Sequence, residues 1–310
     1  MESVKCELLN KSEVKILTII VSYNFERWID KCLGSLKESL HPTDVIVLDN
    51  CSKDHTVERV KKEWPEVRII ANDENLGFGK ANNMGISIAL KEGYDAVFLL
   101  NQDAWIDKYT LGTLAEFSEK FTDFGILSPV HCDGGGINLD YGFAACTHVA
   151  DKRQLPYTSD PVECEFINAA FWFIPIRVIK NIGGFSPLFY HYGEDKDYVH
   201  RIAYHHYKLG YIPTVFGCHD RAFRKTTESD FFRGERVYLL SEYLDINHGF
   251  CHCFAYSVLA EIKKALVSLV KLNFKYFWRF MGIASGMLIH TPRICRFRKT
   301  YKEKCPHFID

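Results

Sequence analysis

Three carboxylates fall within four consecutive positions of this chain, since Glu194, Asp195 and Asp197 are interrupted only by Lys196. Like charges this close raise the pKa of at least one carboxyl group, because each ionised group disfavours ionisation of its neighbour. A carboxylate with a raised pKa suits a general base, which accepts a proton from a reacting hydroxyl. Acids also favour the first turn of a solvated helix, so without other motifs this segment would more often be structural than catalytic.

A second candidate site follows an apolar run that ends at Leu100. Asn101 and Asp103 place an amide and a carboxylate two residues apart, with Gln102 between them. A carboxylate in this place can bind a hard divalent cation, because Mg²⁺ and Mn²⁺ take oxygen ligands and complete their shell from a substrate's phosphates. Asn and Asp are also common turn formers after strands, so the metal interpretation needs support from other motifs.

Two further segments offer groups that a nucleotide could contact. Asp49 and Asn50 end another apolar run and can hydrogen-bond a base. Residues 75–83 begin with a glycine turn and supply Lys80 and several amides where a helix is expected to start. A helix start of this kind is a suitable place to receive phosphate.

All of these polar residues follow predicted strands. Short β-branched runs indicate strands at 16–22, 44–49, 67–71 and 95–100. Apolar residues at helical spacing indicate covering helices at 27–39, 56–64 and 80–91. This alternation predicts a parallel sheet, in which ligands bind beyond the carboxyl ends of the strands. We therefore expect one common crevice to be lined by Tyr23, Asn24, Asp49, Asn50, Asn101 and Asp103.

Taken in order, the motifs resemble those of family 2 glycosyltransferases. The matching segments are 21–24, the residues around Asp49, 75–79, 101–103 and 193–197, and the resemblance extends over about residues 15–225. The pattern looks like the rhamnosyltransferase-like branch. It implies an α/β GT-A fold, with a mainly parallel central sheet flanked by helices, and inversion at the anomeric carbon. The implied donor is a UDP- or dTDP-sugar, dTDP-rhamnose among them, and the implied acceptor is a saccharide or lipid-linked sugar in cell-surface polysaccharide synthesis.

The resemblance also assigns roles to single residues. It implies that Asp195 is the catalytic base and that Glu194 positions the catalytic loop. Asp103 would hold Mg²⁺ or Mn²⁺, and His219, after a strand predicted at 211–215, would be another metal ligand. The first acid of the family's usual Asp-x-Asp motif is Asn101 here, which leaves Asp103 as the principal carboxylate ligand. Contacts to the nucleotide sugar are implied for Tyr23, Asp49, Asn50, Asn75, Gly77, Lys80, Asn101 and Gln102.

Three other functions share some of these sequence features. Gly77 and Gly79 begin like a dinucleotide fingerprint of a dehydrogenase, but position 82 is Asn and the motif follows the third predicted strand rather than the first. A nucleotidyltransferase would share the sheet and the metal carboxylate but would leave Glu194 and Asp195 without a role. A non-catalytic sugar-binding or scaffold protein would need neither a base nor a metal.

Composition predicts a cytoplasmic protein without a nucleic-acid partner. Lys and Arg number 38 against 39 Asp and Glu, so a global positive field is absent. The 11 cysteines include no CxxC pair, which is typical of reduced thiols in a cytosol. Five charged residues interrupt any apolar run before Ile16, so no signal peptide is expected; they are Glu2, Lys5, Glu7, Lys11 and Glu13.

The last part of the chain differs in composition from the rest, and we predict a catalytic domain at 1–250 with a basic helical extension at 251–310. Between residues 255 and 304 apolar residues mix with 11 Lys or Arg, while Glu261 and Glu303 are the only acids. Such a surface can sit on anionic lipid at the inner face of the cell membrane. It can equally pack on the catalytic domain or on a second subunit of a homo-oligomer, and the sequence leaves these alternatives open. The charge-free stretch 280–292 is shorter than the roughly 20 residues that a membrane-spanning helix needs.

Overall fold

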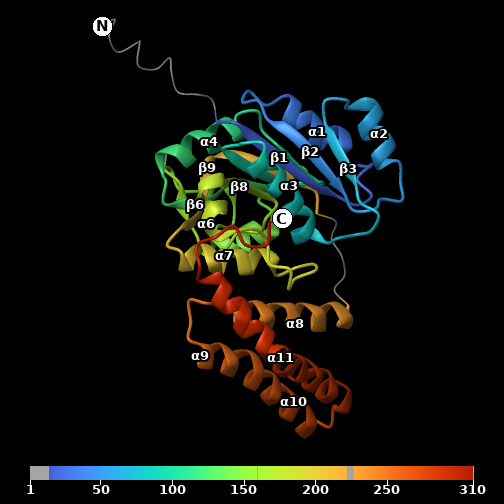
Figure 1. The fold of residues 1–310 in the computed structure, drawn as a ribbon, viewed down its shortest axis with the longest axis vertical. Coiled ribbons are helices and arrows are strands. Elements are labelled where there is room, and N and C mark those ends of the chain that lie inside the picture. Colours follow the sequence, from blue (N-terminus) through green and yellow to red (C-terminus); the bar gives the residue numbers. More distant parts are fainter. Residues whose placement is uncertain (1–13, 159, 222–226, 310) are drawn as a thin grey trace, which may run out of the picture.

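The computed structural model describes residues 14–158, 160–221 and 227–309. Its main body is a nine-stranded sheet with helices packed against both faces, and a group of helices projects from one end of this body (Figure 1). The charged residues that argue against a signal peptide lie before residue 14, outside the described residues.

The first half of the sheet is parallel, as the alternating sequence pattern predicts. The four strands are β1 (Ile16–Ser22), β2 (Asp44–Asp49), β3 (Arg68–Ala71) and β4 (Ala96–Asn101). They are joined through helices α1 (Ile29–Lys37), α2 (Thr56–Glu63) and α3 (Phe78–Lys91). In the paired strands Ser22 lies opposite Asp49 and Val21 lies opposite Asn101, so the polar strand ends meet at one edge.

The second half of the sheet is mixed. The strand order β3-β2-β1-β4-β8-β6-β9-β5 inserts β8 antiparallel between β4 and β6, and β7 pairs with β9 at the side. These strands are β5 (Ala104–Ile106), β6 (Phe124–Asp133), β7 (Val162–Glu163), β8 (Phe171–Pro175) and β9 (Lys208–His219). The accompanying helices are α4 (Thr110–Lys120), α5 (Tyr141–Thr147), α6 (Ile176–Ile182) and α7 (Glu194–Tyr204).

Residues 131–161, for which weak periodicity predicts long loops, are partly regular. Strand β6 continues to Asp133, and α5 follows within the segment. The helix begins because the Asp140 carboxylate accepts the backbone N–H of Phe143 at 3.0 Å, while the Phe143 ring is buried in the core. The long loops expected here are therefore interrupted by regular elements.

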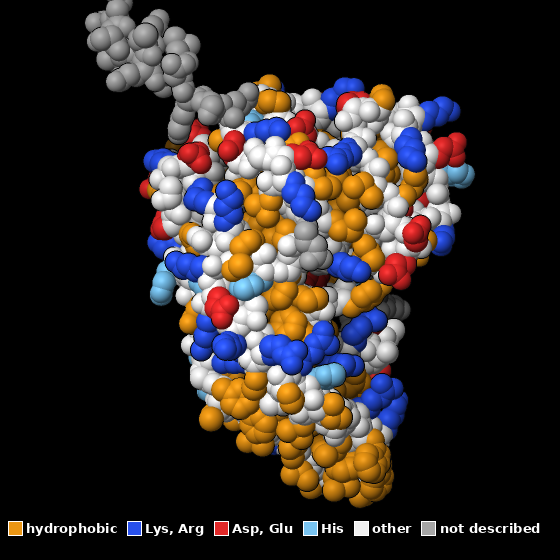
Figure 2. All heavy atoms as spheres, viewed as in Figure 1, with side chains coloured by type: hydrophobic (Ala, Val, Ile, Leu, Met, Phe, Trp, Pro, Cys, Tyr) orange, Lys and Arg blue, Asp and Glu red, His pale blue; other side chains and the backbone are white. Residues whose placement is uncertain are grey.

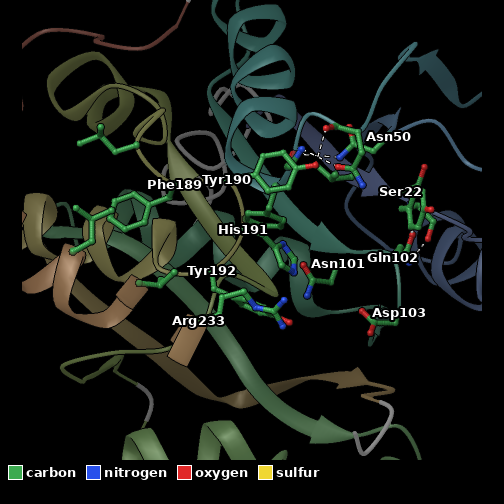
Figure 3. A pocket seen from close by; sticks show the side chains of 18 of the residues that line it. Ser22, Asn50, Asn101, Gln102, Asp103, Phe189, Tyr190, His191, Tyr192 and Arg233 are labelled. Carbon is green, nitrogen blue, oxygen red and sulfur yellow. Dashed lines mark hydrogen bonds between the residues drawn. The ribbon is translucent and has the colours of Figure 1, made fainter. Parts of the chain in front are cut away.

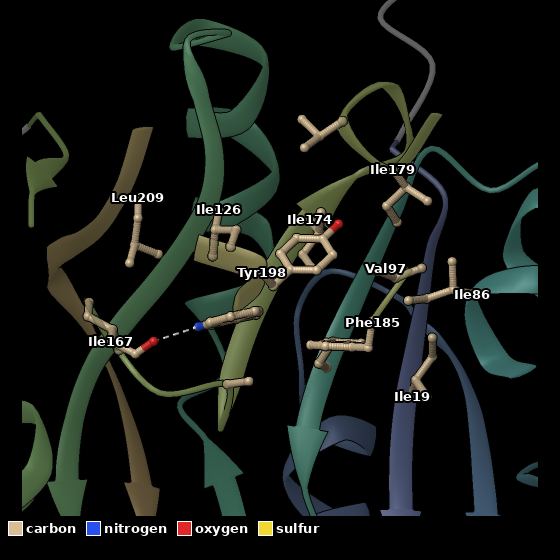
Figure 4. Packing of buried hydrophobic residues seen from close by; sticks show 14 of the residues in the cluster. Ile19, Ile86, Val97, Ile126, Ile167, Ile174, Ile179, Phe185, Tyr198 and Leu209 are labelled. Carbon is tan, nitrogen blue, oxygen red and sulfur yellow. Dashed lines mark hydrogen bonds between the residues drawn. The ribbon is translucent and has the colours of Figure 1, made fainter. Parts of the chain in front are cut away.

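Alternate residues of each strand point to opposite faces of the sheet and build two core clusters. Ile19 packs on one face with Ile86 of α3 and Ile179 of α6 (Figure 4), whereas Ile20 packs on the other with helices α1 and α4. Burying an aliphatic side chain of this kind contributes about 1.5–3 kcal/mol. The two clusters hold the sheet edge, and thus the polar strand ends, in fixed positions.

A third core cluster joins the C-terminal helices α8 (Glu228–Leu244), α9 (Phe250–Phe254), α10 (Ala260–Val270) and α11 (Phe274–Tyr301). Five residues in a π-helical turn link α9 to α10. Among the described residues, no helix is both long and apolar enough to cross a membrane. The domain boundary after residue 250 stays a prediction, and α8 on its nearer side shares this cluster with helices beyond it.

Residues 301–309 return from α11 to the main body (Figure 1). The Tyr301 hydroxyl donates to Ser186 Oγ at 2.7 Å, and the Asn83 side chain donates to the Phe308 carbonyl at 2.9 Å. The fully buried guanidinium of Arg201 lies 5.0 Å from the centre of the Tyr301 ring. The segment after α11 is therefore part of the packing around α7.

Candidate functional site

The ends of β1 and β4 are tied together by one amide side chain. Gln102 Oε1 accepts the backbone N–H of Tyr23 at 2.8 Å, and Gln102 Nε2 donates to the Tyr23 carbonyl at 3.1 Å. This reciprocal pair holds the Tyr23 backbone at the rim while its ring remains about half exposed. A planar exposed ring at a strand end can stack on a nucleobase.

The end of β2 presents an amide to the glycine turn before α3. Asn50 is buried, its Nδ2 donates to the Gly77 carbonyl at 3.2 Å, and its Oδ1 accepts the N–H of Leu76 at 3.3 Å. The neighbouring Asp49 is turned away and accepts hydrogen bonds from Ser22 and Ser52. The Asn50 side chain therefore holds the turn in place, and the Asp49 carboxylate points away from the turn toward Ser22 and Ser52.

Gly77 adopts φ +78°, a conformation that L side chains rarely take. A Cβ built there would lie 2.1 Å from the carbonyl oxygen of Tyr190, and the Tyr190 hydroxyl donates to the Asn75 carbonyl at 3.0 Å. The turn and the segment around Tyr190 thus meet in direct backbone contact. Only glycine permits this approach.

Asp103 and His219 face each other at the ends of β4 and β9. Asp103 Oδ1 lies 3.1 Å from His219 Nε2, and Asn101 Nδ2 lies 3.4 Å from the same nitrogen. The imidazole is buried, whereas the Asp103 side chain keeps a quarter of its surface exposed. The exposed carboxylate is therefore open to a ligand, with the histidine behind it.

Residues at these strand ends and in the turn before α3 bound a cavity of about 680 Å³. Figure 3 shows Asn50, Asn101 and Asp103 on one side of it and the segment from Phe189 to Tyr192 on the other. The wall includes seven residues for which a ligand or metal contact was predicted: Tyr23, Asn50, Asn75, Gly77, Asn101, Gln102 and Asp103. Five others stand outside the wall: Asp49, Lys80, Glu194, Asp195 and His219. Lys80 is exposed in the first turn of α3.

The acidic cluster forms the first turn of α7. Glu194 is buried, and burial together with the charge of Asp195 raises the pKa of Glu194 to about 7. Burial also raises the pKa of Asp195, against the opposing hydrogen bond that its carboxylate accepts from the N–H of Lys196 at 2.8 Å. Asp197 instead forms a buried ion pair with Arg201 at 3.1 Å. Burial raises the pKa of Asp197 as well, but the charge of Arg201 opposes that rise. All three carboxyl groups therefore hold a proton more tightly than usual, and Asp197 alone is paired with a buried cation.

A short segment after β9 links the two candidate centres. His219 contacts Asp103, and two residues later Arg221 lies 3.8 Å from the carboxylate of Asp140. The positive charge of Arg221 also opposes the rise in the pKa of Asp195. Nothing in the sequence around Arg221 indicates a site residue, because its charged neighbours are Asp140, the N-cap residue of α5, and Asp195 of α7.

Three basic residues of the cavity wall were not predicted as site residues. Arg233 and Arg236 reach it from α8, and His191 was taken for an ordinary surface or packing residue. Figure 3 shows His191 and Arg233 directed toward the space that Asn101 and Asp103 border. The only sequence signal for the arginines was a pair of basic residues three apart on one helix. Among its described residues the wall carries cationic groups together with one carboxylate, Asp103, an arrangement that suits an anionic ligand with a metal ion.

The donor atoms at Asp103 and His219 fit a hard divalent cation. Neighbouring ligands of an octahedral ion with bonds of about 2.1 Å lie about 3.0 Å apart, close to the 3.1 Å between Oδ1 and Nε2. No group of three or more His, Cys, Asp or Glu side chains that could hold a metal occurs among the described residues. A cation at this pair would therefore take further ligands from phosphate and water, as Mg²⁺ usually does.

Known proteins resemble this chain in sequence and in fold. The model of the family described as glycosyl transferase family 2 matches residues 18–163. The glycosyltransferase SunS of Bacillus subtilis (strain 168), derived from the SPbeta prophage, is 31% identical over 117 residues, which are 37% of this chain and 26% of SunS. The chain thus matches about a quarter of the length of that relative.

Two other proteins match over more of the chain. The N-acetylglucosaminyl-diphospho-decaprenol L-rhamnosyltransferase of Mycobacterium tuberculosis (strain CDC 1551 / Oshkosh) is 22% identical over 233 residues, 66% of this chain and 75% of that protein. The mannosyltransferase PcManGT from Pyrobaculum calidifontis, solved with GDP-Man and Mn²⁺, superposes with a TM-score of 0.55 at 17% identity, covering 97% of this chain and 89% of that one. The structural likeness confirms the predicted GT-A fold.

Proposed function

Because this chain belongs to glycosyl transferase family 2, we propose that it transfers a sugar from a nucleoside-diphosphate donor to an acceptor hydroxyl. The observation that carries the proposal is the position of Asp103 at a strand end, 3.1 Å from His219 and on the wall of a cavity that Arg233 and Arg236 also line. A carboxylate for a cation and two guanidinium groups match the charge of a diphosphate.

The nucleobase, the ribose and the diphosphate of the donor bind at different parts of the cavity wall. The nucleobase stacks on Tyr23 and meets the polar groups around Asn50, while the backbone of the Gly77 turn lines the ribose side. The diphosphate lies toward Asp103, where Arg233 reaches it from α8. When bound at Asp103 and His219, Mg²⁺ or Mn²⁺ would neutralise charge on the departing diphosphate. The donor is a UDP- or dTDP-sugar. The first to test is dTDP-rhamnose, because a relative that aligns with 66% of this chain is named a rhamnosyltransferase.

We assign proton removal to Asp195. Its carboxylate accepts the acceptor's hydroxyl proton as that oxygen bonds to the anomeric carbon and the bond to the diphosphate oxygen breaks. Attack from the side opposite the leaving group inverts the anomeric carbon. The raised pKa of Asp195 supports this assignment, because a carboxylate that holds a proton more tightly is a better base near neutral pH.

The acceptor class is a saccharide or a lipid-linked sugar, and the proposed setting is cell-surface polysaccharide synthesis. The rhamnosyltransferase relative, whose name specifies a diphospho-decaprenol acceptor, favours the lipid-linked class. We place the protein in the cytoplasm, at the inner face of the membrane when it meets such an acceptor.

A donor screen tests the proposal. Calorimetry with UDP, dTDP and GDP, each with and without Mn²⁺, should find one nucleotide whose binding needs the metal. The matching nucleotide sugar should then be hydrolysed slowly without acceptor. If no nucleoside diphosphate binds in the presence of Mg²⁺ or Mn²⁺, the proposal is wrong.

A further inference from the structure

Helices α10 and α11 form a hairpin whose far end carries an uncovered apolar surface. Among the described residues 22 large hydrophobic side chains are exposed, and 11 of them belong to residues 256–289. Elsewhere most of the exposed ones are tyrosines, whereas 10 of the 11 here are Leu, Val, Ile, Phe or Trp. An apolar patch of this kind on a folded protein usually marks an interaction surface.

The most exposed of these side chains lie at the turn between the two helices. Val270 and Leu272 are 84% and 75% exposed, and Phe274 and Trp278 in the first turns of α11 are 56% and 70% exposed. We call these four residues the hairpin tip. Figure 2 shows hydrophobic side chains covering this end of the molecule, with a band of Lys and Arg between it and the main body.

Positive charge accompanies the apolar surface. Residues 262–302 contain 10 Lys or Arg and no Asp or Glu. Lys263 and Lys271 are exposed and line a groove of about 660 Å³ between the helices, whose floor includes Val267 and Phe280. The surface thus combines an apolar end with cationic groups beside it.

We propose that the hairpin tip inserts into the interfacial region of a bilayer that contains anionic lipid, with Lys263 and Lys271 at the level of the phosphates. An apolar tip with basic residues beside it complements an acyl interior bounded by anionic headgroups. Trp278 has the side chain that favours this boundary. The 11 residues of α10 span about 16 Å, about half of a hydrocarbon core of about 30 Å, so the contact involves one leaflet.

A second copy of the chain fits this surface less well. A symmetric contact through the tip would bring the lysines of one copy beside those of the other, and no acid between residues 262 and 302 offsets their charge. Anionic headgroups supply the missing opposite charge. The observations therefore favour lipid as the occupant.

The hairpin is also connected to the cavity. Lys264 of α10 forms an ion pair with Glu235, and Lys275 of α11 forms one with Glu228 at 2.7 Å. Both acids belong to α8, the helix that carries Arg233 on the cavity wall. Contact of the tip with a bilayer would fix the orientation of the cavity relative to the membrane. The inference goes beyond the proposed function, and its test needs neither donor nor acceptor.

Vesicle sedimentation of the full chain tests the inference. Vesicles of phosphatidylcholine alone are compared with phosphatidylcholine mixed with phosphatidylglycerol, at low and high salt. The wild type should prefer the anionic vesicles. Val270→Ser with Leu272→Ser should lower partitioning into both kinds of vesicle, on the order of tenfold for each side chain. Lys263→Gln with Lys271→Gln should lower only binding to anionic vesicles, on the order of fivefold for each charge, and reduce its salt dependence.

A matched control is Ile137→Ser, because Ile137 is 77% exposed and belongs to the turn after β6 in the main body. It should bind like the wild type. Trp278 fluorescence, taken as the difference from Trp278→Phe, should shift to shorter wavelength with anionic vesicles. Equal binding by the tip variant and the wild type, or no binding by the wild type, would overturn the inference. A wild-type dimer without lipid that the tip variant converts to monomer, together with no vesicle binding, would identify a second copy as the occupant instead.

Discussion

Glu194→Gln should remove a pH-dependent loss of unfolding free energy that the wild type shows. The folded pKa of Glu194 is raised from 4.5 to about 7, first by burial and then by the charge of Asp195. The folded state therefore resists ionisation of this group more than the unfolded chain does. Its contribution to stability is intact below the unfolded pKa of 4.5 and is lost as pH rises toward the folded value of about 7.

The size of this effect follows from the two pKa values. Between about pH 5 and about pH 8 the wild type should lose about 2.5 kcal/mol of unfolding free energy that Glu194→Gln keeps. Urea unfolding of both proteins at the two pH values measures it, and the pH dependence of their difference isolates Glu194. Glu116→Gln, on the exposed side of α4, is the matched control and should show no such divergence. A wild-type-to-variant difference that stays constant over this range would refute the reasoning.

The remaining predictions concern the candidate site. Asp195→Asn should keep nucleotide binding while transfer falls by roughly a hundredfold or more, since a lost base commonly costs this much; loss of turnover in Glu194→Gln but not in Asp195→Asn would reassign the base. Asp103→Ala should abolish the part of nucleotide affinity that a chelator removes, measured by calorimetry, and equal affinities with and without Mn²⁺ in the wild type would exclude the metal role. Gly77→Ala should destabilise the protein by about 3 kcal/mol or more, because two costs combine. The positive φ strains the alanine backbone, and the new Cβ would lie 2.1 Å from the Tyr190 carbonyl oxygen. Gly93→Ala has a similar φ of +72° and no atom within 4 Å of the new Cβ, so thermal unfolding should show a smaller loss there.

The parallel half of the sheet could be predicted because its signals are local. Each β-branched run lies next to a helix of regular spacing, and parallel order then brings Tyr23, Asn50 and Asp103 to one edge without knowledge of the fold. The position of β8 could not be predicted in this way. Strand β8 pairs with β4 and β6, and each partner lies more than thirty residues away along the chain.

Residues of the cavity wall that were missed depend on packing between distant elements. Arg233 reaches the cavity only because α8 packs over it through the third core cluster, and nothing in residues 228–244 indicates that arrangement. The orientation of the side chains within a correctly predicted motif could not be predicted from the sequence either. Asp49 and Asn50 are neighbours, but two serines hold the Asp49 carboxylate behind the wall while Asn50 faces the cavity.

The return of residues 301–309 to the main body has a consequence for how this protein is made. Arg201 is fully buried partly against Tyr301, which the ribosome adds 100 residues later. At roughly 5–20 residues per second this interval lasts about 5–20 s. During that time the nascent chain presents a guanidinium and the uncovered side of α7 to solvent. Chaperones that bind such an unfinished surface should matter for this protein until Tyr301 and Phe308 are in place.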